Sequence, residues 1–235
     1  MISLRKSEER GHTKIDWLDS YHSFSFGEYY DPQHVHFGPL RVFNDDTVAA
    51  MGGFPTHPHK NMEIVSIVTL GRMAHGDSTG SQGIIKVNDV QRMTAGKGVY
   101  HSEFNASDNQ ILKFFQVWFI PNETDLTPSY EQISFDPEER KNKLQLIVSG
   151  NVNDGVVFIN QDAKMYLSDL EKGNKLRYIT SSERGVYIHV ADGAVDINGY
   201  KAEPGDAIKI TEETEFEISA SEKSSFILFD MTLNV

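Results

Sequence analysis

Residues 53–68 read Gly-Phe-Pro-Thr-His-Pro-His-Lys-Asn-Met-Glu-Ile-Val-Ser-Ile-Val. This segment places two histidines, His57 and His59, just before a short run of β-branched residues that is typical of a buried strand. Similar runs recur at residues 83–87, 112–120, 144–148 and 226–231, and Gly, Asn and Asp clusters bound most of them. No long segment shows the 3.6-residue apolar period of an amphipathic helix. The sequence therefore predicts an all-β fold of the sandwich or barrel type.

The two halves of the chain look like diverged copies of one β-unit. Each copy has a Gly, then an Asp, then a Thr five residues after the Asp, at Gly83, Asp89 and Thr94 and again at Gly199, Asp206 and Thr211. A further Gly precedes each segment at a predicted hairpin, at positions 71 and 193. Self-similarity of this kind predicts two similar β-units. We place them in residues 1–125 and 144–235, with residues 126–143 as a polar, proline-containing linker.

The composition argues against several classes of partner and site. The net charge is −12, with 34 acidic against 22 basic residues. A surface of that sign repels phosphate groups, so we expect no direct binding to nucleic acid or to an anionic membrane. The absence of Cys excludes disulfides, thiolate ligands and a Cys nucleophile. No apolar run approaches the ~18 residues of a membrane span, and the charged N-terminal segment does not resemble a signal peptide, so we expect a cytoplasmic protein.

Two residue pairs predict a metal site. His57 and His59 form an H-x-H pair, and His101 and Glu103 form an H-x-E pair. Side chains at positions i and i+2 of a strand lie on one face, roughly 6.6–6.8 Å apart. If the two strands face each other across a barrel, the four groups converge on one point. Imidazole and carboxylate suit Fe²⁺, Ni²⁺, Cu²⁺, Co²⁺, Mn²⁺ or Zn²⁺, and three histidines with one carboxylate leave positions open, as catalytic sites do.

Other histidines and the second copy do not repeat this arrangement. A second H-x-H pair, His34 and His36, has no partner pair, so we interpret it as a pair of loop or surface histidines. In the second copy, counting from the shared Gly and Thr reaches Ile179, Ser181, Ile218 and Ala220 at the four ligand positions. None of these is a good metal ligand. We therefore expect the C-terminal barrel to be structural.

Seven stretches carry a family resemblance. They are Tyr21-His-Ser-Phe-Ser-Phe26, Phe37-Gly-Pro-Leu-Arg-Val-Phe-Asn-Asp-Asp46, Gly53-Phe-Pro-Thr-His-Pro-His59, Met62-Glu-Ile-Val65, His75-Gly-Asp-Ser78, Met93-Thr-Ala-Gly-Lys-Gly98 and His101-Ser-Glu103. In these segments the chain resembles the pirin family of the cupin superfamily, strongly over residues 10–120 and in general style beyond. The resemblance implies a bicupin, with two β-barrel (jelly-roll or double-stranded β-helix) domains packed together.

The resemblance also assigns the site. Pirin metal ligands fall on positions matching His57, His59, His101 and Glu103. In many other cupins the glutamate at the place of Glu63 is itself a ligand, whereas the pirin pattern makes Glu63 a hydrogen-bonding residue close to the ligands or at the barrel rim. Gln116 is a second candidate for such a role, because it shares strand parity with Trp118 and both could line the interior. Core packing is the alternative for these two residues.

The activity implied by bacterial pirins is oxidation of the flavonol quercetin with O₂. Quercetin 2,3-dioxygenase chemistry cleaves the heterocycle at the 2,3 bond and releases carbon monoxide, and Glu103 would be the general base. The cofactor would be one divalent transition metal ion, with iron expected first and copper, nickel, manganese, cobalt or zinc as alternatives. Eukaryotic pirins are described as iron-dependent transcriptional co-regulators, so a regulator that binds a protein partner is the rival hypothesis. A cupin enzyme acting on another aromatic or enol substrate is a third.

Overall fold

The structure, a computed structural model, describes residues 1–234 and consists almost wholly of β-strands. The chain divides into two compact units. We call residues 10–135 with 157–161 the N-terminal unit, and residues 1–9, 136–156 and 162–234 the C-terminal unit. The all-β prediction is confirmed, and strands cover each run of β-branched residues that predicted one.

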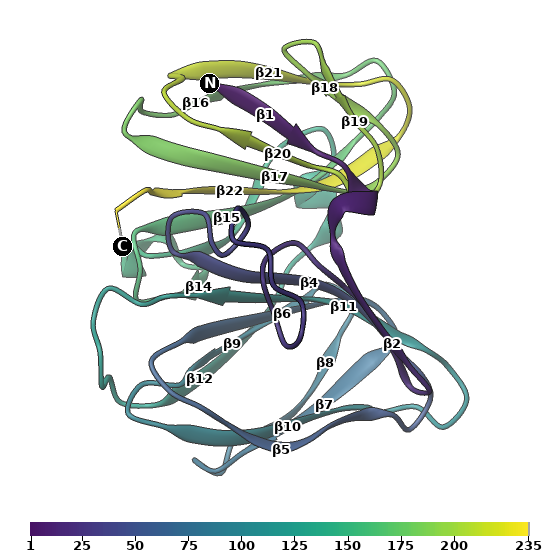
Figure 1. Ribbon diagram of the computed structural model, residues 1–235, viewed down its shortest axis with the longest axis vertical. Helices are drawn as coiled ribbons and strands as arrows, with labels where there is room; N and C mark the ends of the chain where they lie inside the picture. The colour runs from purple at the N-terminus through teal and green to yellow at the C-terminus, as the bar shows by residue number, and fades with distance from the viewer. Residues whose placement is uncertain (235) are drawn as a thin grey trace. The chain divides into compact units, whose positions relative to one another are not determined.

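The N-terminal unit contains two sheets (Figure 1). The strands of these sheets are β2 (Gly11–Ile15), β3 (Leu18–His22), β4 (Leu40–Val48), β5 (Gly53–His59), β6 (Glu63–Leu70), β7 (Arg72–Asp77), β8 (Gln82–Lys86), β9 (Asp89–Thr94), β10 (Val99–Asn105), β11 (Leu112–Phe119) and β12 (Ser129–Ser134). The short strand β14 (Val157–Phe158) also lies in this unit but in neither of its two sheets. A seven-stranded sheet has the order β12-β9-β6-β11-β4-β3-β2, and a four-stranded sheet has the order β5-β10-β7-β8.

The C-terminal unit repeats this arrangement. Its strands are β1 (Ile2–Arg5), β13 (Gln145–Ser149), β15 (Ala163–Leu170), β16 (Lys175–Ile179), β17 (Arg184–Asp192), β18 (Val195–Ile197), β19 (Tyr200–Ala202), β20 (Ala207–Ile210), β21 (Glu215–Ala220) and β22 (Ser224–Thr232), with short 3₁₀ helices at Ser7–Glu9, Pro137–Arg140 and Val152–Asp154. The order β20-β17-β22-β15 matches β9-β6-β11-β4, and β16-β21-β18-β19 matches β5-β10-β7-β8. The predicted repeat is therefore confirmed in the topology of the two units.

The hairpin glycines of the two copies occupy equivalent turns. Gly71 lies between β6 and β7 with φ +80°, and Gly193 lies between β17 and β18 with φ +70°. A Cβ atom on Gly71 would lie 2.7 Å from the carbonyl oxygen of Ile111, and one on Gly193 would lie 2.2 Å from that of Lys223. Both positions therefore need glycine for its backbone conformation and for space.

The limits of the units differ from the predicted ranges. Residues 1–9 belong to the C-terminal unit, because β1 pairs with β20 (Figure 1, purple strand). Residues 129–134, placed in the predicted linker, form β12 and pair with β9 in the N-terminal unit. Residues 157–161 also belong to that unit. These pairings are non-local, so the polarity of the sequence did not reveal them.

One row of side chains distinguishes the interiors of the two units. Directly paired residues point to the same face of a sheet, and the pairing in the N-terminal unit aligns Gln91, Ser66, Gln116, Asn44 and His22 across five strands. The equivalent positions of the C-terminal unit are Ile208, Ile188, Leu228 and Tyr166, which lie in or against its hydrophobic core. The N-terminal unit thus keeps a polar layer where the C-terminal unit is packed with apolar side chains.

Candidate metal centre

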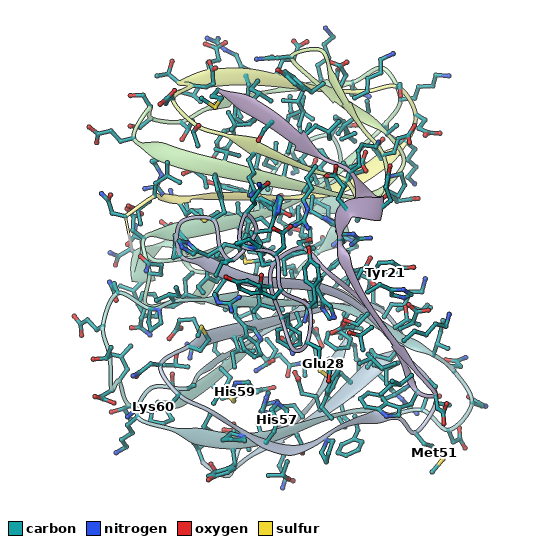
Figure 2. All side chains as sticks on the ribbon, in the orientation of Figure 1. Tyr21, Glu28, Met51, His57, His59 and Lys60 are labelled. Carbon is teal, nitrogen blue, oxygen red and sulfur yellow. The ribbon has the colours of Figure 1, made fainter. Side chains whose placement is uncertain are left out.

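The two candidate ligand pairs lie on neighbouring strands of one sheet. Strand β10 pairs with β5 so that His101 is opposite His57, and a β-bulge follows between His101 and Glu103. Figure 2 shows His57 and His59 on the inner side of β5. The two strands are hydrogen-bonded neighbours and do not face each other across a barrel, the condition under which the sequence predicted convergence. Strand pairing brings side chains such as His57 and His101 within about 5.5 Å at Cβ.

The three histidines aim their ring nitrogens at one point. Ligand atoms of His57, His59 and His101 all lie within 4.8 Å of one another, and the Nε2 atoms of His57 and His101 are 3.0 Å apart. His57 Nδ1 donates a hydrogen bond to the Pro55 carbonyl oxygen at 2.8 Å. Because a carbonyl can only accept, this bond keeps the proton on Nδ1 and leaves the lone pair of Nε2 free for a ligand role.

Burial keeps two of these imidazoles neutral. Burial, followed by the neighbouring histidines, lowers the pKa of His59 to about 4 and that of His101 to about 3. His59 Nε2 and His101 Nδ1 are buried and have no hydrogen-bond partner among residues 1–234. A neutral ring is the form that binds a metal ion. The buried, unpartnered Nε2 of His59 therefore fits a ligand that an ion would satisfy.

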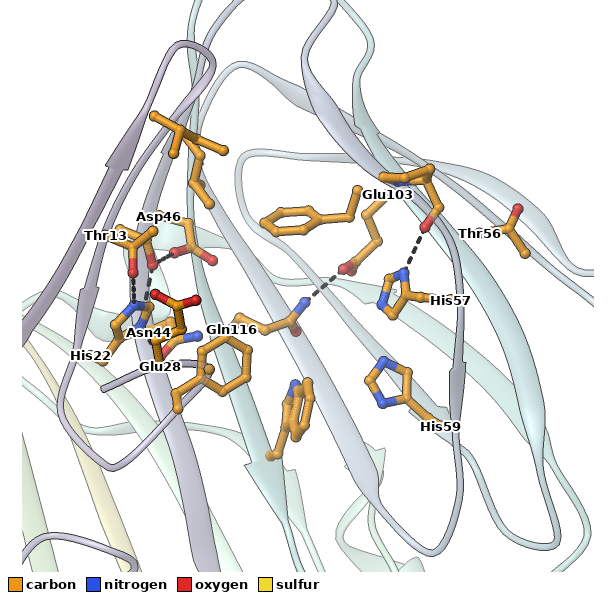
Figure 3. A pocket seen from close by; sticks show the side chains of 18 residues that line it. Thr13, His22, Glu28, Asn44, Asp46, Thr56, His57, His59, Glu103 and Gln116 are labelled. Atoms are coloured by element: carbon orange, nitrogen blue, oxygen red, sulfur yellow. Dashed lines mark hydrogen bonds between the residues drawn. The ribbon is translucent and has the colours of Figure 1, made fainter. Parts of the chain in front are cut away.

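Glu103 is held next to the histidines by the polar row of the facing sheet. Its carboxylate accepts from Gln116 Nε2 at 2.8 Å (Figure 3). It also accepts from Ser66 Oγ at 3.1 Å. Ser66 Oγ also lies 3.0 Å from Gln116 Oε1. The side chain of Glu103 is buried, so these two donors fix its orientation.

His75 and Glu103 form a second group of potential ligands, which shares His101 with the group of His57 and His59. Sequence reasoning did not place His75 at the site. It is directly opposite Glu103 in the pairing of β7 with β10, and the ligand atoms of His75, His101 and Glu103 lie within 4.8 Å of one another. His75 Nε2 contacts Asp77 Oδ2 at 3.2 Å. Its cross-strand position opposite Glu103 was the missing signal, and this depends on strand register rather than on sequence spacing.

The donor set fits a divalent metal ion. Two imidazole nitrogens that each lie about 2.1 Å from one ion are about 3.0 Å apart when they meet it at a right angle, and the Nε2 atoms of His57 and His101 have this separation. Imidazole with a carboxylate is a donor combination that several first-row divalent ions accept. The geometry alone does not select among those ions.

A cavity of about 620 Å³ opens beside the candidate ligands. His57, His59 and Glu103 line it at one end, and Figure 3 shows His22, Asn44 and Asp46 at the other. Rings follow one another along a wall between these ends: His59 to Trp118 at 4.7 Å, Trp118 to Phe26 at 5.4 Å, and Phe26 to His22 at 5.2 Å between centroids. A concave, largely apolar space with few convergent polar groups is typical of a small-molecule site.

Comparison with known proteins agrees with this arrangement. The chain is 43% identical to the quercetin 2,3-dioxygenase of Escherichia coli K12 over 231 residues, covering 98% of this chain and 99% of that protein. The chain belongs to the pirin family. The family description Pirin matches residues 3–119, and Quercetinase C-terminal cupin domain matches residues 146–231. Both units are therefore cupins, as the resemblance implied.

Two further pirin relatives extend the comparison. The crystal structure of the bacterial pirin YhhW from E. coli in complex with nickel(II) superposes with a TM-score of 0.94 at 41% identity, covering all of both chains. A pirin-like protein of Caulobacter vibrioides is 34% identical and covers 98% of this chain and 99% of its own. The chain thus shares the fold and the family of these relatives, and its histidine cluster is suited to a divalent ion such as the nickel of the E. coli complex.

Glu63 lies outside the pirin site. It is three positions from Ser66 on β6, so it points to the opposite face of the sheet, where Thr94 Oγ1 and Asn160 Nδ2 donate to it at 3.1 and 3.2 Å. Burial raises its pKa. The prediction that Glu63 bonds close to the ligands is therefore corrected, whereas Gln116 does contact Glu103.

The remaining sequence predictions concern histidines and membranes. His34 Nδ1 contacts Asp31 Oδ2 at 2.8 Å, and His36 Nδ1 donates to the Gly38 carbonyl oxygen at 2.9 Å. Neither residue is in a cluster of potential ligands among residues 1–234.

Over the same residues, no helix has the length and apolar character needed to cross a membrane.

Proposed function

We propose that this pirin is a metal-dependent dioxygenase that cleaves the heterocycle of a flavonol, with quercetin as the representative substrate. One flavonol and one O₂ are consumed, and a ring-opened ester and carbon monoxide are released. The observation that carries the proposal is the aromatic-walled cavity of about 620 Å³ that opens onto the candidate ligands. Cavities of this size hold ligands of a few fused or linked rings.

The proposal assigns the ion to His57, His59, His101 and Glu103. Neutral imidazoles at His59 and His101, and an unprotonated Nε2 on His57, support the nitrogen ligands. We propose iron as the resident ion, because imidazole and carboxylate donors with open positions suit Fe²⁺. Nickel, copper, manganese, cobalt and zinc remain alternatives with the same donor set.

Glu103 would act as the general base. When bound, the ion supplies Lewis acidity that lowers the pKa of a coordinated flavonol 3-hydroxyl. Glu103 would accept the proton of that hydroxyl, and Gln116 Nε2 and Ser66 Oγ hold the carboxylate in place while it does so. Trp118 and Phe26 would flank the flavonol rings and exclude water from the reacting carbons.

The rival hypothesis is a regulator that binds a protein partner. Such a role needs a surface that responds to the ion but no internal cavity beside it. The cavity in the N-terminal unit therefore favours catalysis on a small aromatic molecule, whether flavonol or another enol.

Quercetin loss followed by absorbance tests the proposal. Protein loaded with Fe²⁺, Mn²⁺, Ni²⁺ or Cu²⁺ is compared in air and under argon, and carbon monoxide is measured in the headspace. Oxygen-dependent bleaching with carbon monoxide release, lost in a His57→Ala, His59→Ala double variant, is the expected result. Absence of bleaching with every ion that binds would reject flavonol oxidation and favour the regulator or another substrate.

A further inference from the structure

The end of the cavity remote from the candidate ligands is polar and built by two neighbouring strands. Asn44 and Asp46 come from β4, and Ser20 and His22 come from β3, directly opposite them in the strand pairing. All four line the cavity. This cluster has no part in holding the ion, because Gln116 separates it from Glu103 along the polar row.

Two polar atoms in this cluster face the cavity without a partner. Asn44 Oδ1 accepts from His22 Nδ1 at 2.9 Å, and Asp46 Oδ1 accepts from Ser20 Oγ. No hydrogen bond from any residue in the described part of the chain reaches Asn44 Nδ2 or Asp46 Oδ2. Both residues are only 2% exposed and both line the cavity. Their unpartnered donor and acceptor therefore open onto the cavity, where a ligand that displaces water must satisfy them.

The supporting contacts fix these two side chains. Thr13 Oγ1 lies 2.9 Å from His22 Nε2, which completes the chain Thr13–His22–Asn44. His22 therefore presents a proton to Asn44 Oδ1 and turns the amide Nδ2 to the opposite side. Ser20 occupies one oxygen of Asp46 in the same way. Figure 3 shows Asn44 and Asp46 beside each other across the cavity from His57 and His59.

The two ends of the cavity are joined by a wall of rings. Strand β4, which carries Asn44 and Asp46, is the direct neighbour of β11, which carries Gln116. Neighbouring strands lie ~4.8 Å apart, and Gln116 Nε2 is a further 2.8 Å from Glu103. The row of rings from His59 through Trp118 and Phe26 to His22 runs along one side between these ends. A planar aromatic molecule can therefore stack along the wall and reach both ends.

We propose that Asn44 and Asp46 form a hydroxyl-recognition subsite that selects aromatic substrates with a phenolic hydroxyl on the ring farthest from the metal-binding end. A hydroxyl group is both donor and acceptor, so its oxygen accepts from Asn44 Nδ2 while its proton is donated to Asp46 Oδ2. A bare ring offers neither atom a partner and leaves both buried groups unsatisfied. The inference rests on the proposed function only in taking a flavonol as the test ligand.

Binding under argon tests this subsite without turnover. Ni²⁺-loaded protein is titrated with quercetin, which carries hydroxyls on every ring, and with 3-hydroxyflavone, which has only the metal-binding hydroxyl. We expect wild-type protein to bind quercetin about tenfold more tightly, as measured by tryptophan fluorescence and calorimetry. In Asn44→Ala and Asp46→Ala the preference should fall to within about threefold, with the Kd of 3-hydroxyflavone nearly unchanged.

A neighbouring residue supplies the matched control. Asp45 lies between the two subsite residues but pairs with Phe115 and Tyr21 on the opposite face of the sheet, so Asp45→Ala should keep the preference for quercetin. Equal binding of the two flavonols to wild-type protein, or an unchanged preference in both subsite variants, would overturn the subsite. The ligand comparison in wild-type protein serves as the test if a variant does not fold. If wild-type protein prefers quercetin to 3-hydroxyflavone but does not bleach quercetin in air, the subsite is retained and the proposed oxygenase activity is rejected.

Discussion

The Nε2 atoms of His57 and His101 lie 3.0 Å apart, although 44 residues separate the two histidines in the chain. The pairing of β5 with β10 sets this distance, and the hydrogen bond from His57 Nδ1 to the Pro55 carbonyl oxygen orients one ring. The nitrogen ligands are therefore positioned by the fold itself. An ion that binds them will stabilise the folded protein, because the unfolded chain has no such site.

Adding Ni²⁺ should raise the free energy of unfolding. At a free concentration 100 times the dissociation constant, the expected gain is about 2.7 kcal/mol, which calorimetry and chemical denaturation can measure. The His57→Ala, His59→Ala variant should lose this gain. The matched control is His34→Ala, His36→Ala, which removes the other H-x-H pair and should retain it. An equal gain in both double variants would place the ion elsewhere.

Replacing Gln116 with Leu should weaken the site through Glu103. The change removes the 2.8 Å bond to Glu103 Oε2, so the carboxylate loses one of the two donors that fix its orientation. We expect metal affinity or oxygen-dependent quercetin loss to fall about 10- to 100-fold. Metal titration and steady-state kinetics on the same preparation provide the measurement.

Gln91 is the control for that substitution, because it belongs to the same polar row but does not contact Glu103. Both polar atoms of its amide are buried without partners among residues 1–234. Gln91→Leu should therefore leave metal affinity unchanged and keep or increase stability, since an unsatisfied buried amide is removed. Equal losses of metal affinity in the Gln91 and Gln116 variants would show that the row acts only by packing.

The buried carboxyl of Asp46 should make stability pH-dependent. Burial raises its pKa to about 7 from an ordinary value of 3.8. The folded state thus binds this proton more tightly than the unfolded state. The contribution of protonated Asp46 to the free energy of unfolding is therefore fully present below pH ~4 and is lost as the pH rises to ~7. Between pH 5 and 8 the free energy of unfolding should fall by about 2–3 kcal/mol from this group.

The Asp46→Asn variant isolates this contribution. Its free energy of unfolding relative to wild-type protein should rise from pH 5 to pH 8, measured by urea denaturation with excess chelator to remove metal effects. Parallel stability curves for the two proteins would contradict the predicted titration of Asp46.

Gly71→Ala should destabilise the N-terminal unit by about 2 kcal/mol or more. The added Cβ meets the Ile111 carbonyl oxygen at 2.7 Å, and φ is +80°, which L side chains rarely adopt. Gly80 has a similar φ of +94° but open space around its Cβ position. Gly80→Ala should therefore cost only about 1 kcal/mol, from the backbone alone. Thermal denaturation measures the stability of both variants. Equal losses of stability in Gly71→Ala and Gly80→Ala would show that the contact with the Ile111 carbonyl oxygen adds nothing.

Local patterns in the sequence were enough to predict much of this protein. Runs of β-branched residues predicted strands such as β6 and β11, because alternation and propensity act within a few residues. The spacing within the H-x-H and H-x-E pairs selected His57, His59, His101 and Glu103, because side chains at i and i+2 of a strand lie on one face. The repeat of Gly, Asp and Thr predicted two similar β-units.

Strand pairing between distant segments decided the rest. It set Thr94 and Asn160 against Glu63, placed His75 opposite Glu103, and added residues 1–9 to the C-terminal unit. It also gathered His22 and Asn44 at the far end of the cavity. None of these relations has a local signature, because register is set by the packing of whole sheets and a shift of one residue would turn each side chain to the other face.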